Sequence, residues 1–318
     1  MKKTLLAMAA LAFVSAASAQ SSVTMYGVVD AGFINDGTTT KFAGAGVNGT
    51  SRLGFKGTED LGGGLNAVFQ VETGLNSGKE TATSIGDRGA FVGLTGGFGT
   101  VTLGSSVLSP SFFARAATDS STTNNYGIAT FGGATRLDNS VNYTSPNFSG
   151  LTIRASMVQK ADNGDTKAAN DISAVFANGP LTVAASIADN GKAEGKGSFV
   201  GASYNLGMAT VFVNHVKAVG TPAVAAANAV AAVPGNAGTA AVVAAAAKVG
   251  DTFTGFGVSA PVGAFILQAD YNKAKNTDVS TFVLSAQYAL SKRSSVTGYT
   301  SKASGADPKV GFGVRHNF

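Results

Sequence analysis

The sequence feature that most constrains the fold is an alternation of apolar and polar residues with a period of two. In the stretch TMYGVVDAGF, Met25, Val29 and Phe33 lie on one face of an extended chain, and Thr24 and Asp30 lie on the other. The pattern recurs in about sixteen segments. These lie near residues 23–34, 50–59, 65–73, 87–95, 100–104, 139–145, 151–159, 170–177, 181–188, 198–205, 209–217, 252–260, 264–273, 279–289, 294–301 and 308–318. The sequence therefore predicts an all-β protein whose strands have unlike faces.

The connections between these segments alternate between short turns and longer, more polar loops. Short turns rich in Gly, Asn, Ser or Pro occur at residues 60–63, 95–97, 145–147, 178–180 and 260–263. Such alternation distinguishes the two rims of an up-and-down barrel. An open sheet edge in lipid would leave backbone groups unpaired, so the sheet must close. We therefore expect a closed, up-and-down, antiparallel transmembrane β-barrel of about sixteen strands.

The chain begins with the features of a secretory signal peptide. Two lysines precede an apolar run, and small residues follow it. The run is shorter than the ~20 residues that a membrane-spanning helix requires. We expect cleavage between Ala19 and Gln20, which removes residues 1–19 and leaves residues 20–318 as the barrel.

The composition excludes several classes of function. Charged residues make up 13% of the chain, below the ~25% of soluble domains. Without the two signal-peptide lysines, the 23 basic residues become 21 against 18 acidic ones, and they are dispersed along the chain, which argues against nucleic-acid binding. Cysteine is absent, which excludes disulfides, thiolate metal sites and cysteine nucleophiles. We expect neither a cofactor nor a metal.

A soluble secreted β-sandwich or β-helix would show the same alternation of residues. Two features argue against such a protein. The polar face carries Arg52, Glu72, Arg88 and Arg154 in or beside the predicted strands, and the chain ends on an aromatic residue, Phe318. Charged side chains on the polar face suit a water-filled lumen.

A barrel with hydrolytic activity needs a general base beside a nucleophile. The two histidines are His215, beside the loop that follows its strand, and His316, on the apolar face of the last strand. Nothing in the sequence places either of them near a serine. We therefore expect that the protein is not an enzyme.

Five sequence blocks, in order, cover both ends and the first half of the chain. They are the signal peptide followed by SSVTMYGVVDAG, the stretches SRLGFKGTEDLGGGLNAVFQVETG, DRGAFVGLTGGFGTVTLG and RLDNSVNYTSPNFSGL, and the terminal GVRHNF. Together they resemble the Gram-negative porins of the neisserial and betaproteobacterial type. The resemblance implies a sixteen-stranded barrel in the cell outer membrane, usually a homotrimer, whose third loop folds into the lumen. It also implies contact with outer-membrane lipid, lipopolysaccharide and the barrel-assembly machinery, which reads a terminal aromatic residue such as Phe318.

Two long connections depart from the regular spacing of strands and turns. Residues 105–137 stand where the third loop of porins lies, and they carry Phe112, Phe113 and Arg115 among small polar residues, which favours a compact constriction loop. Residues 218–250 are a low-complexity stretch of Ala, Val, Gly and Pro. We interpret that stretch as an enlarged extracellular loop.

Three arginines are candidates for the wall of the pore constriction. Arg52 lies in the second predicted strand, Arg88 starts the fourth and Arg136 precedes the sixth, and these early strands should lie side by side. In porins that resemble this chain, basic residues at these motif positions face acidic residues of the third strand and the inserted loop, which selects Glu72 and Asp119 here. The alternative for each arginine is a solvated lumen residue paired with a nearby carboxylate.

Lys56 and Arg154 are secondary lumen candidates, with the same alternative. Clustered charge in a narrow channel produces a larger potential than the same charge on an open surface. The sequence therefore predicts a general diffusion porin with a weak preference for anions. Two other functions stay open: a substrate-specific channel for phosphate or organic acids, and a barrel adhesin or receptor that displays its loops.

Overall fold

A computed structural model gives the fold of the protein. It describes residues 22–78, 84–119, 134–159, 168–189, 191, 196–218 and 252–318. The predicted signal peptide, with its cleavage site at Ala19 and Gln20, lies outside these residues. So do the centre of the predicted constriction loop and nearly all of the low-complexity stretch.

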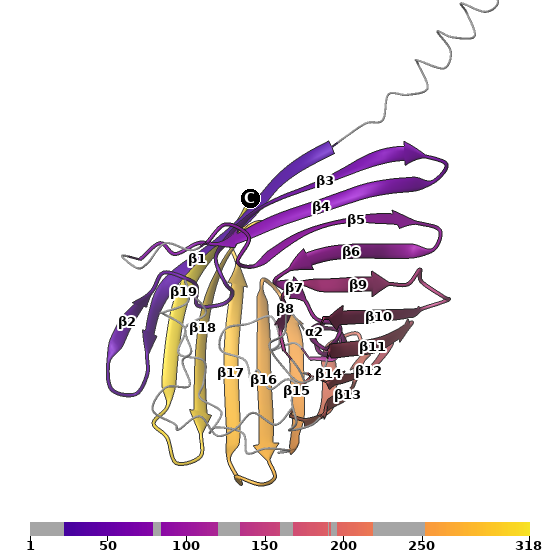
Figure 1. Cartoon of the computed structure of the whole chain (residues 1–318). Helices are drawn as coiled ribbons and strands as arrows, with labels where there is room; N and C mark the ends of the chain where they lie inside the picture. The colour runs from indigo at the N-terminus through magenta and orange to yellow at the C-terminus, as the bar shows by residue number, and fades with distance from the viewer. Residues whose placement is uncertain are drawn as a thin grey trace, which may run out of the picture.

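Sixteen strands of the described chain form one closed antiparallel ring (Figure 1). In ring order they are β1 (Ser22–Asn35), β3 (Arg52–Gly62), β4 (Leu65–Gly74), β5 (Gly89–Gly96), β6 (Gly99–Ser105), β9 (Ser140–Thr144), β10 (Leu151–Val158), β11 (Ala169–Asn178), β12 (Leu181–Asp189), β13 (Lys196–Asn205), β14 (Thr210–Lys217), β15 (Thr252–Val262), β16 (Phe265–Ala274), β17 (Ser280–Ala289), β18 (Ser294–Ala303) and β19 (Lys309–Asn317). The predicted closed barrel is confirmed, and each predicted segment coincides with one ring strand.

The ring closes where the first strand meets the last. The second half of β1 pairs with β19, from Val28 opposite Asn317 to Asn35 opposite Val310. The first half of β1 pairs with β3 on its other edge. Gly27 and Phe318 then exchange two backbone hydrogen bonds, of 3.1 and 3.0 Å, and extend the seam to the last residue. Closure in this way pairs the two sheet edges with each other.

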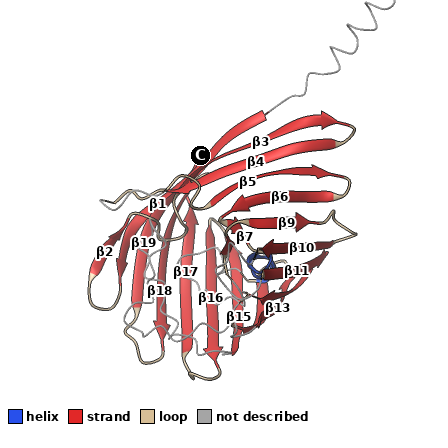
Figure 2. Cartoon of the chain, viewed as in Figure 1, coloured by secondary structure: helices blue, strands red, loops and turns tan. Residues whose placement is uncertain are grey.

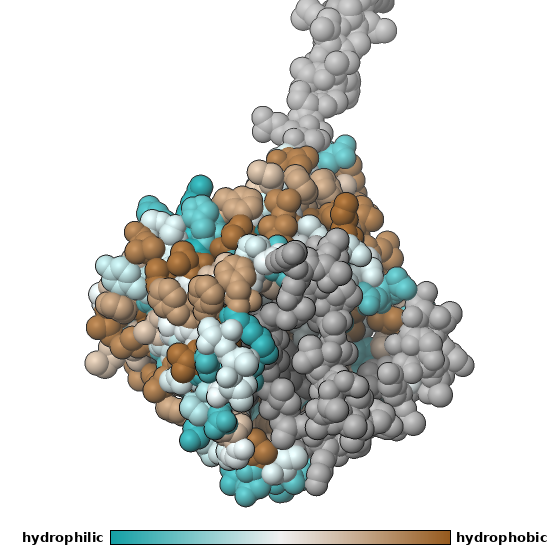
Figure 3. Space-filling view, turned by 90° about the vertical axis from the view of Figure 1, so that its left-hand side faces the viewer, coloured by the Kyte–Doolittle hydropathy of each residue, from teal (hydrophilic) through white to brown (hydrophobic). Residues whose placement is uncertain are grey.

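The alternation read from the sequence becomes an apolar outer face and a polar, small-residue inner face. Met25, Phe33 and Phe312 point outward and are 58%, 56% and 55% exposed. Asp30 and Thr297, which point inward, are almost completely buried. Apolar side chains are spread over the described outer surface in Figure 3. An exposed apolar surface of this kind is the face that a barrel turns to lipid.

Besides the sixteen ring strands, the described chain has three short strands and one helix. They are β2 (Thr40–Ala43), β7 (Val107–Leu108), β8 (Arg136–Leu137) and α2 (Pro110–Thr118). Strand β2 pairs with the end of β1 and belongs to the same sheet as the ring, whereas β7 and β8 form a separate pair. No helix in the part of the chain that the structure describes combines the length and the apolar character needed to cross a bilayer.

Helix α2 belongs to the inserted third loop (Figure 2). Ser109 caps it by accepting a 3.1 Å hydrogen bond from the Phe112 amide, and Pro110 occupies its first turn. The helix packs on the inner faces of β11, β12 and β13. Small inward residues such as Ala184 and Gly201 leave room for it, because a Cβ at Gly201 would lie 2.5 Å from the Thr118 hydroxyl.

A second segment, residues 44–51, also folds into the interior of the ring. Val47 is fully buried in a cluster with Ile34, Val283 and Tyr299. It lies directly over Gly313 of β19, where a Cβ would come within 2.7 Å of the Val47 Cβ. The sequence analysis placed residues 50 and 51 in a predicted strand and the residues before them in one of the longer, more polar connections. The segment folds inward because glycine on the inner face of β19 leaves a depression that an apolar side chain can fill.

The carboxylate of Asp30 holds this inserted segment. It is 0% exposed and accepts backbone hydrogen bonds from Val47 (2.6 Å), Asn48 (3.1 Å) and Gly49 (2.9 Å). The Ser51 hydroxyl completes the contact by donating to the Asp30 carbonyl oxygen over 2.8 Å. Successive amides that point at one anion form an anion-binding nest. Asp30 therefore ties the segment to the middle of β1.

We predict that Asp30→Ala destabilises the barrel. Hydrogen bonds to a charged group contribute about 1.5–3 kcal/mol each, so the loss of three acceptor contacts should lower the free energy of unfolding by about 3 kcal/mol or more. The measurement is the temperature at which the folded barrel loses its characteristic electrophoretic mobility. Asp307→Ala, at an exposed turn residue, is the control. An unchanged unfolding midpoint for Asp30→Ala would show that the Asp30 hydrogen bonds to residues 44–51 do not stabilise the barrel.

Candidate pore constriction

Glu72 of β4 is the centre of a charged group on the inner wall. Its carboxylate lies 2.9 Å from Arg88 Nε, 3.7 Å from Arg136 Nη2 and 3.8 Å from Arg52 Nε. The Tyr26 hydroxyl donates to the same carboxylate over 2.9 Å. We call these five residues the Glu72 cluster. The structure thus brings together four of the five residues predicted for the constriction.

The sheet register explains why these side chains meet. Glu72 stands opposite Gly54 of β3 on one side and Gly89 of β5 on the other. The missing side chain at Gly54 lets the Tyr26 ring cross over β3, since a Cβ there would lie 2.3 Å from the ring. The Nη1 atom of Arg136 lies over Gly89, 3.8 Å from the position that a Cβ on residue 89 would occupy. Two glycines therefore open the wall on both sides of the carboxylate.

Backbone contacts hold each arginine in place. Arg52 donates to the Thr50 carbonyl oxygen over 3.1 Å, and Arg136 donates to the Ser106 carbonyl oxygen over 2.8 Å. Arg88 donates its own amide to the Glu72 carbonyl oxygen over 3.1 Å. Arg136 comes from β8, which pairs with β7 of the inserted loop. The third loop therefore supplies one member of a group otherwise built on the first strands of the ring.

The Glu72 cluster carries an excess of positive charge. Three guanidinium groups surround one carboxylate, which gives a formal charge of about +2. Burial, and the nearby Arg88, lower the pKa of Arg136 to about 10, while Glu72 opposes the shift. Arg136 therefore stays protonated at neutral pH. The arginine side chains keep 19–27% of their surface exposed, so they can attract an anion in the lumen.

Asp119, the fifth predicted residue, is not part of this group, and the structure places it at the end of α2. It follows the last turn of α2, is 5% exposed, and accepts from Arg115 Nε over 3.2 Å and from Asn214 Nδ2 over 3.3 Å. Asn214 belongs to β14, which lies eight strands from β4 in the ring. The i,i+4 spacing along α2 brings Arg115 to Asp119. Asp119 therefore anchors the helix to the opposite wall.

Lys56 and Arg154, the secondary lumen candidates, point inward and form no ion pair with Glu72. Lys56 Nζ lies 5.4 Å from the centre of the Tyr26 ring, and Arg154 Cζ lies 4.4 Å from the centre of the Phe113 ring. Both are cation–π contacts. These two residues line a separate cavity between β3 and β10.

The sequence analysis missed the inward aromatic residues. It named only Phe112 and Phe113 of the constriction loop, whereas in the structure Tyr26, Phe91 and Phe199 point inward. The signal for Tyr26 was present, since it shares its parity in β1 with the inward residues Thr24 and Asp30.

Both histidines lie on the outer face beside hydroxyl groups. His316 Nδ1 is 2.9 Å from Ser294 Oγ, and His215 Nδ1 is 3.0 Å from Thr254 Oγ1. Nothing in the sequence pointed to a serine beside His316. Among the described residues, no carboxylate contacts either imidazole within ion-pair distance, and no group of His, Asp and Glu has the arrangement of a metal site. The described chain thus pairs His316 with a hydroxyl but provides no acid to complete a triad.

A family model for Gram-negative porins matches residues 6–305. The chain belongs to the Gram-negative porin family. It is 34% identical over 254 residues to an outer membrane porin protein of Bordetella pertussis, and the match covers 65% of each chain. It is also 34% identical over 241 residues to outer membrane porin protein 32 of Delftia acidovorans, covering 66% of this chain and 67% of that one. The match to the Bordetella porin thus spans slightly less than two thirds of its length.

A solved structure extends the likeness over almost the whole barrel. The anion-selective porin from Comamonas acidovorans superposes with a TM-score of 0.68 at 23% identity, and the match covers 94% of this chain and 100% of that one. At this level of identity, the likeness supports the fold. Family membership and the closed ring together make this porin a β-barrel of the outer membrane.

We predict that Glu72→Gln destabilises the porin most at low salt. Without the carboxylate, the three arginines repel one another, and salt screens that repulsion. We expect a loss of about 1–3 kcal/mol at low ionic strength, because the cluster is partly exposed, and a smaller loss in ~1 M salt. Thermal unfolding at the two salt concentrations measures the difference. Glu59→Gln, at an exposed residue of β3, is the control. A salt-independent loss would argue against the electrostatic role.

Proposed function

We propose that this porin is a general diffusion channel for small hydrophilic solutes and ions, with a weak preference for anions. The observation that carries the proposal is the Glu72 cluster, where three arginines and one carboxylate lie on the inner wall of a closed barrel. A pore of this kind performs no bond chemistry. Its function depends on the width of the lumen and on the sign of the charges that line it.

The inserted segments supply the narrowing that such a filter needs. Helix α2 covers part of the wall across the ring from β3 and β4, and residues 44–51 cover part of the wall near β1 and β19. The Glu72 cluster lies on the wall formed by β3 and β4, where Arg52 binds the carbonyl oxygen of Thr50. The solved Comamonas porin is described as anion-selective. Here the positive excess of the cluster is the independent support for the same preference.

We also propose the homotrimer, the lipid and lipopolysaccharide contacts and the barrel-assembly partner that the porin resemblance implies. The broad apolar outer face suits both lipid and a neighbouring subunit. Phe318 is 41% exposed, and its ring covers Gly27 at the seam of the barrel. This aromatic residue of the last strand lies at the seam with the first strand, a position that suits recognition by the assembly machinery.

The first test measures ion selectivity. The reversal potential of the purified porin in a planar bilayer, under a KCl gradient, should show a preference for chloride. Arg52→Ser and Arg136→Ser should each reduce the preference, because each removes one positive charge and so lowers the positive excess of the Glu72 cluster. Arg293→Ser, at an exposed turn residue, should leave it unchanged. Cation preference in the wild type, unaffected by the two cluster variants, would contradict the proposed filter.

The second test concerns Phe318. Deletion of this residue removes two backbone hydrogen bonds at the seam and the ring over Gly27. We expect less assembled porin in the outer membrane, while export to the periplasm continues. Phe318→Tyr keeps an aromatic terminus and should restore assembly. Normal levels of heat-modifiable porin after the deletion would contradict an assembly role.

Two other functions make different predictions in the same bilayer experiment. An adhesin or receptor that only displays its loops would insert without a steady open conductance. A substrate-specific channel for phosphate or organic acids would conduct, but its substrate would block the salt current at low concentration. The lumen aromatics Tyr26, Phe91 and Phe113 favour this second alternative over the first.

A further inference from the structure

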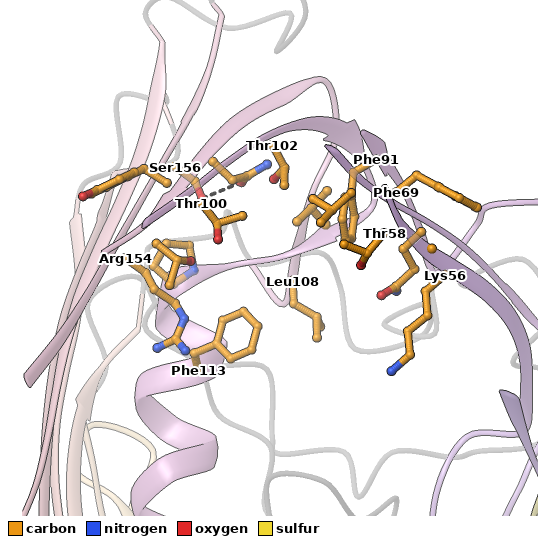
Figure 4. A pocket seen from close by; sticks show the side chains of 18 of the residues that line it. Lys56, Thr58, Phe69, Phe91, Thr100, Thr102, Leu108, Phe113, Arg154 and Ser156 are labelled. Carbon is orange, nitrogen blue, oxygen red and sulfur yellow. Dashed lines mark hydrogen bonds between the residues drawn. The ribbon is translucent and has the colours of Figure 1, made fainter. Parts of the chain in front are cut away.

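A cavity of about 500 Å³ lies in the lumen beside β3, β4, β6, β9 and β10 (Figure 4). Its charged lining residues, within the described chain, are Lys56 and Arg154, and no carboxylate lines it. Volumes of about 300–1,000 Å³ are typical of small-molecule sites. The cavity is thus large enough for a small organic solute, and its lining has only positive charge.

The two cations lack acidic partners. Among the described residues, no carboxylate lies within ion-pair distance of Lys56 or Arg154, and no oxygen accepts a hydrogen bond from either. Their close contacts are with the faces of the Tyr26 and Phe113 rings. Arg154 is partly buried on β10, so the five N–H donors of its guanidinium have limited access to water. A carboxylate would satisfy those donors in a bidentate manner.

The rest of the lining is divided between apolar and hydroxyl-bearing side chains. Figure 4 shows Arg154 and Phe113 together on one side of the cavity, Lys56 on the other side and Leu108 between them. Thr100 and Thr102 of β6 lie along the barrel wall. Phe113 and Leu108 belong to the inserted loop. The loop therefore turns an apolar surface towards a cavity whose two ends are cationic.

The cavity lies next to the Glu72 cluster on the path through the barrel. Lys56 is four residues beyond Arg52 along β3, towards the short turn at residues 62–64, which corresponds to about 13 Å along the strand. Gln70, which lines the cavity, is two residues from Glu72 and on the same face of β4. An anion that passes the arginines therefore meets this cavity next.

We propose that this cavity is a binding subsite for amphipathic organic anions, in which Arg154 holds a carboxylate, Phe113 and Leu108 contact an apolar body, and Lys56 adds positive charge at the other end. The inference rests on the proposed pore function and names a class of solute for it. A small inorganic anion could use the two cations but would leave the apolar surface uncovered. A neutral apolar solute would leave both cations without an acidic partner. An aromatic carboxylate satisfies both parts of the lining.

The test is block of the chloride current through the full-length porin in a planar bilayer. Benzoate is the probe, acetate supplies the charge without the ring, and benzyl alcohol supplies the ring without the charge. We expect benzoate to reduce the KCl current at concentrations at least about tenfold lower than either control compound, since each ~1.4 kcal/mol of added contact corresponds to a tenfold change. Equal effects of benzoate and acetate would overturn the proposal.

Variants then locate the subsite. Arg154→Gln should raise the half-blocking benzoate concentration by about tenfold, the expected effect of losing a charge-assisted hydrogen bond, and Lys56→Gln should raise it by a smaller factor. Arg293→Gln, the same change at an exposed turn, should leave it unaltered. Heat-modifiable mobility of each variant confirms that it folds. An unchanged half-blocking concentration in folded Arg154→Gln would overturn the assignment.

The same recordings separate this inference from the function on which it rests. If the wild-type porin conducts KCl but benzoate does not block it, the subsite fails and the pore remains. If no steady conductance appears at all, the proposed pore function itself fails. Phe113→Leu gives an independent check on the apolar half, because it should weaken benzoate block by several-fold while acetate sensitivity stays constant.

Discussion

The pairing of β1 with β19 is the constraint on which the rest of the structure depends. Backbone groups in lipid have no water to bind, so a sheet that spans a membrane must join its two edges. Here the register of β1 against β19 and the final hydrogen bonds between Gly27 and Phe318 complete that ring. Closure also fixes which face of every strand is inside. Once the ring is closed, the alternation of residues is sufficient to produce an apolar outer wall and a polar lumen.

Within the closed ring, the inner wall is shaped by small residues as much as by charges. Glycine at positions 54 and 313 allows Tyr26 to cross one strand and Val47 to lie over another. Helix α2 uses a third set of small residues, on β12 and β13. Polar anchors then hold each inserted piece: Asp30 holds residues 44–51, and Asp171 accepts from the Ser111 amide and hydroxyl at the start of α2. Both anchors are buried carboxylates that bind donors of a loop, so negative charge is used for holding loops and positive charge stays available in the lumen.

The three arginines and Glu72 could be grouped from the sequence. Asp119, the second acidic residue predicted to face them, lies elsewhere. Arg52 begins β3 and Arg88 directly precedes β5, so the order of the strands places both on one wall, and the pairing of β8 with β7 brings Arg136 to the same wall. The position of Glu72 follows from the same strand register. The position of Asp119 depends instead on the path of helix α2 in the inserted loop, which pairs Asp119 with Arg115 and Asn214.

The sequence by itself determined the barrel, its strands and the apolar face that each strand turns outward, because a period of two is a local property of each strand. Only the tertiary structure decided how the lumen is filled. The inward fold of residues 44–51, the direction of α2, the contact of Tyr26 with Glu72 and the cavity between Lys56 and Arg154 all join residues far apart in the chain. Those contacts depend on the space left by glycine and other small residues on facing strands, and no local pattern encodes that space.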